Sequence, residues 1–466
     1  MPRYLALAQQ LLQQINQGQL RPGQPLPSLR QFAEQQQASK NTAIAVYQWL
    51  EQQGWIEARP RQGYFVRARS RLQQPQPAPL SPQLPSLGEL GLQIVRTAMQ
   101  PHWVPLGSAH PCCHFDSLDS WQRQLARSAR QHKPAHSHYQ VPPGHPGLRE
   151  QIRLRLHKRG IWLDADDILL TNGCQEAFTL ALQTLTRPGD IVAVESPCFY
   201  GVLQLLEVLQ LQVLEIPARS PDGIDLAALA SALKQWPVKA LLLHPSYNNP
   251  QGYAMPDSHR HALISLTEPY RLPIIEDEVT AELGYQGQMP LALKSLAPER
   301  VLLCSSFSKT LDPDLRLGWI AAGPWHDALL HRKFVSSMAS PGLQQQALAA
   351  WLQGRGYDRH LRQVRQQYGD NWHQLAQALQ GLPQGCQLNA PAGGYLCWLQ
   401  LPPSVDSLQL WQRADQAGIS LTPGALFGQQ PQLRHSVRLN FAHWHRDIRL
   451  RKAMPKLIEL IEQCQH

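Results

Sequence analysis

Polar side chains follow short apolar runs in the larger, C-terminal part of the chain, and one of them is a lysine with unusual neighbours. Lys309 comes after the apolar run that starts at Val301, and hydroxyl side chains flank it in the segment Ser-Ser-Phe-Ser-Lys-Thr. A lysine amine can form a Schiff base with an aldehyde, which makes Lys309 a candidate catalytic residue. A lone loop lysine is usually solvated, but this one lies near groups that could bind a phosphate, namely Ser306, Ser308 and Arg316.

A second phosphate-binding group is expected where the run Ile168-Leu-Leu ends and a helix begins. The turn Thr-Asn-Gly-Cys-Gln-Glu places three backbone N–H groups at that helix start, those of Gly173, Cys174 and Gln175. The N-terminus of a helix offers unpaired N–H groups and a favourable dipole to an anion. This signal is weak by itself, because many strand-to-helix turns have a similar composition.

Three further residues complete a set that suits one cofactor. Phe199 follows an apolar run and could stack on a flat ring, although an aromatic residue is more often part of the core. Asn249 follows the apolar run that begins at Ala240. Asp277 follows the run that begins at Pro273, and a carboxylate at that point could equally cap a helix. A reactive lysine, an acid for a pyridinium proton, an aromatic ring, an amide and a phosphate-binding cup are together the groups expected for pyridoxal 5'-phosphate.

The elements that must position these groups form an alternating pattern of strands and helices. Apolar runs recur, with helical stretches such as 176–185 and 257–266 between them; the runs begin near 168, 191, 213, 240, 273, 301 and 317. Strands this apolar predict an α/β fold with a mainly parallel seven-stranded sheet covered on both faces, and we expect a smaller C-terminal α+β subdomain after it. Ligands of such sheets bind beyond the carboxyl ends of the strands, where the candidate residues lie.

The first 71 residues have a different pattern, which predicts a winged helix. Three helices and a two-stranded wing are expected, at residues 4–18, 29–36, 40–53, 55–59 and 64–66. Ser28 and Ser39 can cap the second and third helices. The alternative is a small helical protein-interaction domain, because a fold does not fix function.

Several polar residues of this segment could contact DNA. The candidates at the start of the third helix are Ser39, Lys40, Asn41 and Thr42. Side chains at this point of a recognition helix meet base edges in the major groove. Arg30 and the wing could bind phosphates, and the wing candidates are Arg59, Arg61, Gln62 and Gly63.

The positive charge of the chain is concentrated in this segment. Residues 1–71 contain nine Lys or Arg and three Asp or Glu, a net charge of +6, whereas the other 395 residues carry only +3 of the total of +9. Such a distribution favours a polyanionic partner such as double-stranded DNA for the N-terminal segment.

Length and composition exclude several other classes of protein. With 466 residues, 43% of them hydrophobic, the chain is too long for one core and too apolar to be disordered. No apolar run approaches the roughly 18 residues of a membrane span, and the N-terminus does not resemble a secretory signal. The eight cysteines are scattered, and the segment His110-Pro-Cys-Cys-His114 lacks the spacing of a zinc site. We therefore expect a soluble cytoplasmic protein with no metal and no membrane partner, associated with the nucleoid when bound to DNA.

Residues 72–100 separate the two patterns. They are rich in Pro, Gln and Ser and show no periodicity, which predicts a linker. The expected domains are therefore 1–71 for DNA binding, 72–100 as the linker, and 101–466 for cofactor and effector binding and for dimerisation.

The N-terminal segment resembles the GntR-type winged-helix DNA-binding domain over nearly its whole length. The matching motifs are LRPG-x-x-LPS-x-R, the Ser-x-Asn-Thr start of the third helix and the wing ARP-x-x-GYFV. The resemblance implies that Arg30, residues 40–42 and the wing tip at 61–63 contact DNA.

Residues 100–466 resemble the fold-type I aminotransferases, which use pyridoxal 5'-phosphate. The matching motifs are PGHPGLRE after Tyr139, TNGCQEA, NNPQG, IIED, SSFSK and VRLNFAH. The resemblance implies a Schiff base of Lys309 with the cofactor, Asp277 at the pyridine nitrogen and Asn249 at the ring oxygen. It also implies a phosphate site made of Gly173, Cys174, Ser306, Ser308 and Arg316.

The same resemblance assigns three residues outside that set and reveals one departure. Phe199 would stack on the ring, Arg438 would bind a substrate carboxylate, and Tyr139 would reach the partner's site in a homodimer. The family usually has a tyrosine two or three residues after the pyridine Asp, but Val279 and Thr280 occupy these positions. The ring oxygen would lose a hydrogen-bond donor, so we expect at most slow transaminase activity.

The order of the two domains is that of the MocR subfamily of GntR-type transcription regulators, which the chain resembles over essentially its whole length. The resemblance implies a dimeric DNA-binding regulator whose effector is either pyridoxal phosphate or an amino compound that forms an aldimine with it. One alternative is a catalytically active aminotransferase with a DNA-binding head of minor role. Another is a vitamin-binding protein whose head recruits a second protein.

Overall fold

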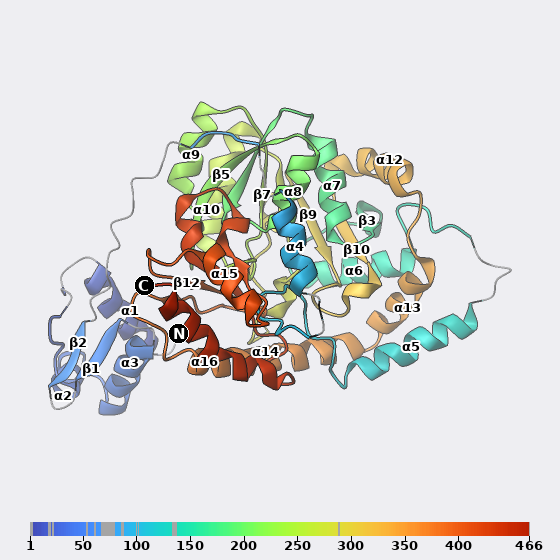
Figure 1. Ribbon diagram of the computed structural model, residues 1–466. Coiled ribbons are helices and arrows are strands. Elements are labelled where there is room, and N and C mark those ends of the chain that lie inside the picture. Colours follow the sequence, from blue (N-terminus) through green and yellow to red (C-terminus); the bar gives the residue numbers. More distant parts are fainter. Residues whose placement is uncertain are drawn as a thin grey trace. The chain divides into compact units, whose positions relative to one another are not determined.

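The computed structural model divides into two compact units, Met1–Pro79 and Leu80–His466 (Figure 1). The residues that the structure describes are 3–16, 20, 23–52, 55–59, 62–66, 80–84, 88–98, 100, 102–132, 138–287 and 289–465. Each unit has a hydrophobic core of its own. No helix in these ranges is long and apolar enough to cross a membrane.

The smaller unit consists of three helices followed by a two-stranded antiparallel sheet. Its elements are α1 (Arg3–Asn16), α2 (Leu29–Gln35), α3 (Lys40–Gln52), β1 (Ile56–Arg59) and β2 (Gly63–Val66). Phe32 and Tyr47 lie in its core with their rings edge to face, 5.2 Å between centroids. The predicted winged-helix arrangement is confirmed, although residues 60 and 61 of the wing tip lie outside the described residues.

Side-chain caps determine where α2 and α3 begin. The Gln31 amide donates to Ser28 Oγ at 3.3 Å, and the Ser28 amide donates to Gln31 Oε1 at 3.0 Å, which together make a capping box. The Thr42 amide donates to Ser39 Oγ at 3.1 Å. Because a cap fixes the first turn of a helix, Lys40 and Asn41 lie at the exposed start of α3.

An eight-stranded sheet lies at the centre of the larger unit. The strands, in spatial order, are β3 (Ile168–Thr171), β10 (Gly318–Ala321), β9 (Val301–Ser306), β8 (Ile274–Asp277), β7 (Val238–Leu243), β4 (Ile191–Ser196), β5 (Gln212–Arg219) and β6 (Gly223–Ile224). The five strands from β9 to β5 are mutually parallel, β10 is antiparallel to both its neighbours, and β6 is antiparallel to β5. The seven predicted strands are present, and β6 is an addition that is too short to leave an apolar run.

Helices cover both faces of this sheet. They are α6 (Pro146–His157), α7 (Cys174–Leu185), α8 (Tyr200–Val208), α9 (Leu226–Gln235), α10 (Asp257–Thr267), α11 (Leu293–Leu296), α12 (His326–Ser337) and α13 (Gly342–Gln353), and α5 (Leu118–Gln131) packs against α13. Along β4, Val192 packs in the same cluster as Leu203 of α8, whereas Ala193 packs with Leu229 of α9 on the other face. Burial on both faces explains why the strands have near-continuous apolar sequences.

The C-terminal part forms the predicted α+β subdomain. A four-stranded antiparallel sheet has the order β11 (Gln387–Leu388), β12 (Leu396–Gln400), β14 (Ser436–Asn440) and β13 (Thr422–Pro423). The accompanying helices are α14 (Gly356–Ala378), α15 (Ser407–Gln416) and α16 (Ile448–Gln463).

The second half of the expected linker is folded, which corrects its boundary at residue 100. Helix α4 spans Gly88–Ala98, and its Ile94 is 2% exposed in the core of the larger unit. Gln83 pairs with Val213 of β5 through two backbone hydrogen bonds of 2.8 and 3.0 Å. The abundance of Pro and Gln conceals these contacts in the sequence, and residues 72–79 lie outside the described residues.

Candidate functional site

The predicted cofactor residues lie at the carboxyl ends of neighbouring strands. Gly173 follows β3, Phe199 follows β4, Asn249 follows β7, Asp277 ends β8 and Lys309 follows β9. The charges of Asp277, Arg316, Arg438 and the Cys174 thiol all act on the Lys309 amine, which therefore has these groups around it. The structure brings together most of the predicted set, and the individual roles stay predictions.

The Lys309 amine is the reactive group of this cluster. Its Nζ donates to the carbonyl oxygen of Ala109 at 3.1 Å. Burial lowers the pKa of Lys309 to about 8, and the positive charge of Arg438 acts in the same direction. A neutral amine is therefore accessible near neutral pH, as nucleophilic addition to an aldehyde requires.

Asp277 is a buried carboxyl that faces a histidine. One of its oxygens accepts from the Val279 amide at 3.1 Å, and the other lies 3.6 Å from His244 Nδ1. Burial raises the pKa of Asp277, whereas His244 opposes that shift. A carboxylate held in this way can stabilise a protonated ring nitrogen placed against it. The contact between His244 and Asp277 has no signal in the sequence, because the two residues are far apart along the chain.

Two glycines and an arginine form a cradle at the start of α7. Gly173 has a φ of +86°, and a Cβ there would lie 2.4 Å from Arg316 Nη2; a Cβ on Gly318 would lie 2.5 Å from the carbonyl carbon of Gly173. Arg316 donates to the Asn172 carbonyl at 3.0 Å and to Ser308 Oγ at 3.4 Å. Because the N-cap is a glycine, no N-cap side chain accepts from the first N–H groups of α7. The cradle therefore fits a phosphate at a helix N-terminus.

Three remaining members of the predicted phosphate and ring site make contacts with neighbouring protein groups. The Gln175 side chain points to α8, where its amide donates to the Gly201 carbonyl at 3.0 Å. Ser306 Oγ accepts from the Ser308 amide at 3.3 Å. Phe199 is half-buried, and its ring lies 4.8 Å from that of Tyr200.

Arg438 is a buried cation that has no acidic partner among the described residues. It is 1% exposed, and its Nη atoms donate to the Gly107 carbonyl at 2.7 Å, Asn249 Oδ1 at 3.1 Å and Thr422 Oγ1 at 3.2 Å. Its Nε has no hydrogen-bond partner in the described part of the chain. Because a buried charge is costly without a counterion, this guanidinium suits a ligand carboxylate.

Thr280 cannot take the place of the missing family tyrosine. Its Oγ1 can donate to the Ser246 carbonyl at 2.8 Å and lies 2.6 Å from His244 Nε2. The Thr280 hydroxyl is thus already engaged by His244 and a backbone carbonyl. Tyr395, which sequence reasoning missed, donates to the same Ala109 carbonyl as Lys309, at 3.0 Å.

Tyr139 is 71% exposed, unlike the buried residues around Lys309. Other exposed apolar side chains lie on its segment and on α12, and the Ser340 amide joins the two regions through the Gln140 carbonyl at 3.3 Å. The exposed side chains are Val141, Phe334, Val335 and Met338.

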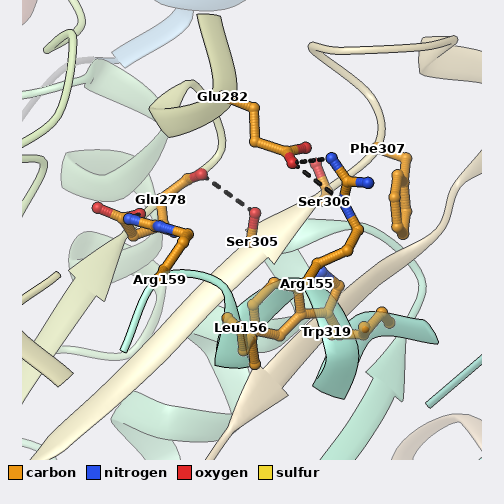
Figure 2. A pocket seen from close by; sticks show the side chains of 10 residues that line it. Arg155, Leu156, Arg159, Glu278, Glu282, Ser305, Ser306, Phe307 and Trp319 are labelled. Atoms are coloured by element: carbon orange, nitrogen blue, oxygen red, sulfur yellow. Dashed lines mark hydrogen bonds and ion pairs between the residues drawn. The ribbon is translucent and has the colours of Figure 1, made fainter. Parts of the chain in front are cut away.

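A small cavity of about 30 Å³ lies beside the site and is lined by paired charges (Figure 2). Arg155 donates to Glu282 at 2.5 Å, and Arg159 forms an ion pair with Glu278. Ser305 Oγ donates to the Glu278 carbonyl at 3.1 Å, which joins the end of β9 to the residue after Asp277. The network therefore fixes the two strand ends that present Asp277 and Lys309. The sequence contained no local signal for it, because its partners are far apart along the chain.

Those predicted DNA-binding residues of the smaller unit that the structure describes are exposed apart from Thr42, which is half-buried. Arg30 forms an ion pair with Glu34 at 3.2 Å, and Arg59 pairs with Glu57 at 2.8 Å. Gln62 and Gly63 lie at the exposed start of β2, Ser39 is engaged in capping α3, and Arg61 lies outside the described residues.

These two units define a DNA-binding regulator built on an aminotransferase fold. Residues 3–66 match the family model of bacterial regulatory proteins of the gntR family, and residues 102–450 match that of aminotransferase class I and II. The chain belongs to the MocR subfamily of GntR-type transcription regulators.

Individual relatives agree with this assignment. The HTH-type transcriptional regulator YjiR of Escherichia coli (strain K12) is 37% identical over 95% of each chain. The HTH-type pyridoxine biosynthesis transcriptional regulator PdxR of Corynebacterium glutamicum is 28% identical over 83% of this chain and 81% of its own. The crystal structure of Pyrococcus horikoshii kynurenine aminotransferase has a TM-score of 0.74 and 25% identity, and it covers 81% of this chain and 94% of its own.

The cofactor of the aminotransferase class I and II family is pyridoxal 5'-phosphate. The groups of this chain fit it: an accessible amine at Lys309, a buried acid at Asp277, and the cradle of Gly173 and Arg316. Among the described residues, no group of three or more His, Cys, Asp or Glu side chains is arranged to hold a metal ion.

Proposed function

We propose that the protein is a transcription regulator that responds to pyridoxal phosphate, alone or joined to an amino compound. The smaller unit would bind operator DNA and the larger unit the cofactor and the effector. The observation that carries the proposal is the Lys309 amine, with a pKa of about 8, beside Asp277 and the cradle at the start of α7. The pyridoxine-related name of the Corynebacterium relative supports this vitamin as the signal.

Each residue of the site would have a distinct part in binding. Pyridoxal 5'-phosphate supplies an aldehyde that reacts with amines and a ring that stabilises negative charge. Lys309 would hold the aldehyde covalently, Asp277 would keep a proton on the ring nitrogen, and Asn249 would donate to the ring oxygen. The phosphate would be held by Gly173, Cys174, Gln175, Ser306, Ser308 and Arg316, with Phe199 against the ring.

Arg438 would select effectors that carry a carboxylate. Its hydrogen bonds to the Gly107 carbonyl and Thr422 Oγ1 would have to be exchanged for bonds to the ligand. Gly107 lies on the segment that comes after α4 in the chain. Ligand binding at Arg438 could therefore change the position of this segment and so of the N-terminal part of the larger unit. Regulation then requires that the effector bind the DNA-competent and incompetent states with different affinity.

A homodimer is part of the proposal. Tyr139 would enter the partner's site, and the exposed apolar side chains around it would be buried in the interface, since patches of this kind mark association surfaces. As a DNA-binding regulator the protein would act in the cytoplasm, at the nucleoid when bound.

Footprinting on the DNA upstream of the protein's own coding region, with and without pyridoxal phosphate, tests the function as a whole. A protected segment whose extent or affinity changes with the cofactor is expected, because the effector must bind one DNA-binding state better than the other. Equal protection in both conditions would contradict the cofactor response, and no protection on any bacterial duplex would contradict DNA binding.

The contribution of the winged helix can be measured with single variants. We expect Asn41→Ala to cost about 1–3 kcal/mol of specific binding, and Arg30→Ala to reduce the slope of log affinity against log salt by about 1. Fluorescence anisotropy on a labelled duplex gives both quantities. Gln9→Ala, on the exposed side of α1, is the control and should bind as the wild type does. Unchanged affinity and slope in Arg30→Ala and Asn41→Ala would contradict the assignment.

A second candidate function, efficient transamination, is disfavoured by the position of Thr280. With no tyrosine donor to the ring oxygen, we expect turnover of common amino acids well below the roughly 1 s⁻¹ at the low end of ordinary enzymes. Multiple-turnover assays with pyruvate or 2-oxoglutarate as acceptor measure this rate. Sustained turnover at or above that rate would favour the enzyme over the regulator.

A further inference from the structure

Arginine side chains line the solvent side of α14. Arg355, Arg359 and Arg362 are exposed and recur at intervals of four and three residues, which places them on one face of the helix. Gln366 and His373 continue the same exposed face. Because α14 has 23 residues, this face extends over about 34 Å.

Helix α5 repeats the pattern. Arg123, Arg127 and Arg130 are exposed and have the same intervals of four and three residues. The Ser117 amide, at the N-cap of α5, donates to Gln363 Oε1 of α14 at 3.4 Å. The two basic helices are therefore in direct contact.

The start of α16 adds a third group of cations beside α14. Arg446, Arg451 and Lys452 are exposed, and Arg451 donates to Gln374 Oε1 of α14 at 3.4 Å. Gln363 and Gln374 are separated by about three helical turns and so lie on the same side of α14. Figure 1 shows α16, α14 and α5 following one another along one edge of the larger unit.

Most of these cations have no counterion within the protein. Across the described residues, no ion pair or side-chain hydrogen bond involves Arg123, Arg127, Arg130, Arg355 or Arg359. By contrast, the inward-facing Arg155 and Arg159 pair with Glu282 and Glu278. The exposed set is thus an array of charges available to an external anion, and duplex DNA presents phosphates at regular intervals to such an array.

We infer that this basic face binds the phosphate backbone of duplex DNA that flanks the segment held by the winged helix. The basic face consists of Arg123, Arg127, Arg130, Arg355, Arg359, Arg362, Arg446, Arg451 and Lys452. Arg and Lys contacts to phosphates add affinity and salt dependence without reading sequence. The inference rests on the proposed DNA-binding function, and it extends that function to a surface of the larger unit.

The test compares full-length protein on duplexes of 20 and 60 base pairs of one arbitrary sequence, by anisotropy over a series of salt concentrations. Three proteins are needed: wild type, the triple variant Arg355→Glu, Arg359→Glu, Arg362→Glu, and the control triple Arg187→Glu, Lys234→Glu, Lys239→Glu. The control cations are also exposed but lie near the N-terminal ends of β4 and β7. Thermal unfolding and cofactor absorbance verify that each variant is folded.

On the longer duplex we expect the α14 triple variant to lose about tenfold or more in affinity and up to about 2.7 from the salt slope, at roughly 0.9 for each phosphate contact. On the shorter duplex it should lose little, and the control triple should resemble the wild type on both. An unchanged slope on the longer duplex, an equal loss on both duplexes, or an equal loss in the control would overturn the inference. Failure of the proposed function is distinct, because the wild type itself would then bind neither duplex.

Discussion

Replacing Lys309 with alanine is expected to abolish covalent cofactor binding altogether. The amine is the reactive group of the site, and its charge acts on Asp277. The visible absorbance band of lysine-bound cofactor should therefore not appear at any cofactor concentration, and reduction with borohydride should attach no label. Cofactor-dependent changes in DNA binding should be lost with it, because the effector no longer distinguishes the two states.

Lys294→Ala is the matched control for this experiment. Lys294 is also buried, and its pKa is likewise lowered to about 8 by burial, but its amine donates to the carbonyls of Pro298 and Val301. Its loss should lower stability and leave the absorbance band intact. A band that persisted in Lys309→Ala, or that disappeared equally in Lys294→Ala, would contradict the assignment.

The same pKa predicts how cofactor attachment depends on pH. Only the neutral amine attacks an aldehyde, and a lysine with a lowered pKa loses its proton as the pH rises through about 8. The rate of band formation in wild-type protein should thus increase with pH up to about 8 and level off above it.

The cofactor residues could be predicted because of a topological rule. Each candidate follows an apolar run, and parallel strands place their carboxyl ends at one edge, so residues as distant as Gly173 and Lys309 were expected to meet. What the sequence did not contain was the set of partners from elsewhere in the chain. Arg438 and Lys309 donate hydrogen bonds to the backbone carbonyls of Gly107 and Ala109. A backbone acceptor cannot be recognised from residue type, and the position of these carbonyls follows from tertiary packing alone.

The fold was predictable where periodicity is strong and was missed where it is weak. The two-residue strand β6 is too short to leave a pattern, and α4 lies in a segment whose Pro and Gln content suggested a linker. The net charge of the larger unit did not indicate its basic face. The total is near neutral because inward-facing arginines are paired with acids, while the arginines on α5 and α14 lie on the surface.

Asp277→Asn should have opposite effects on the protein with and without its cofactor. The amide keeps an acceptor for the Val279 N–H but cannot carry the negative charge that would hold a proton on the ring nitrogen. We expect cofactor affinity to fall by about 1.5–3 kcal/mol, roughly ten- to hundredfold, the range for a hydrogen bond to a charged group. In cofactor-free protein the free energy of unfolding should be unchanged or higher, because the substitution removes a buried acid whose charged form is penalised.

Glu195→Gln is the control for Asp277→Asn, because it shows whether the loss of any buried carboxyl near the site lowers cofactor affinity. Glu195 lies one residue before the end of β4 and is 2% exposed, and burial raises its pKa to about 8, so it is mostly protonated at neutral pH. Replacing it with a neutral amide should therefore change cofactor affinity far less than Asp277→Asn. Titration of the absorbance band gives the affinities, and denaturant unfolding gives the stabilities. If Asp277→Asn bound the cofactor as tightly as Glu195→Gln, the proton on the ring nitrogen would have to be held by another group, and His244, 3.6 Å from Asp277, would be the side chain to replace next.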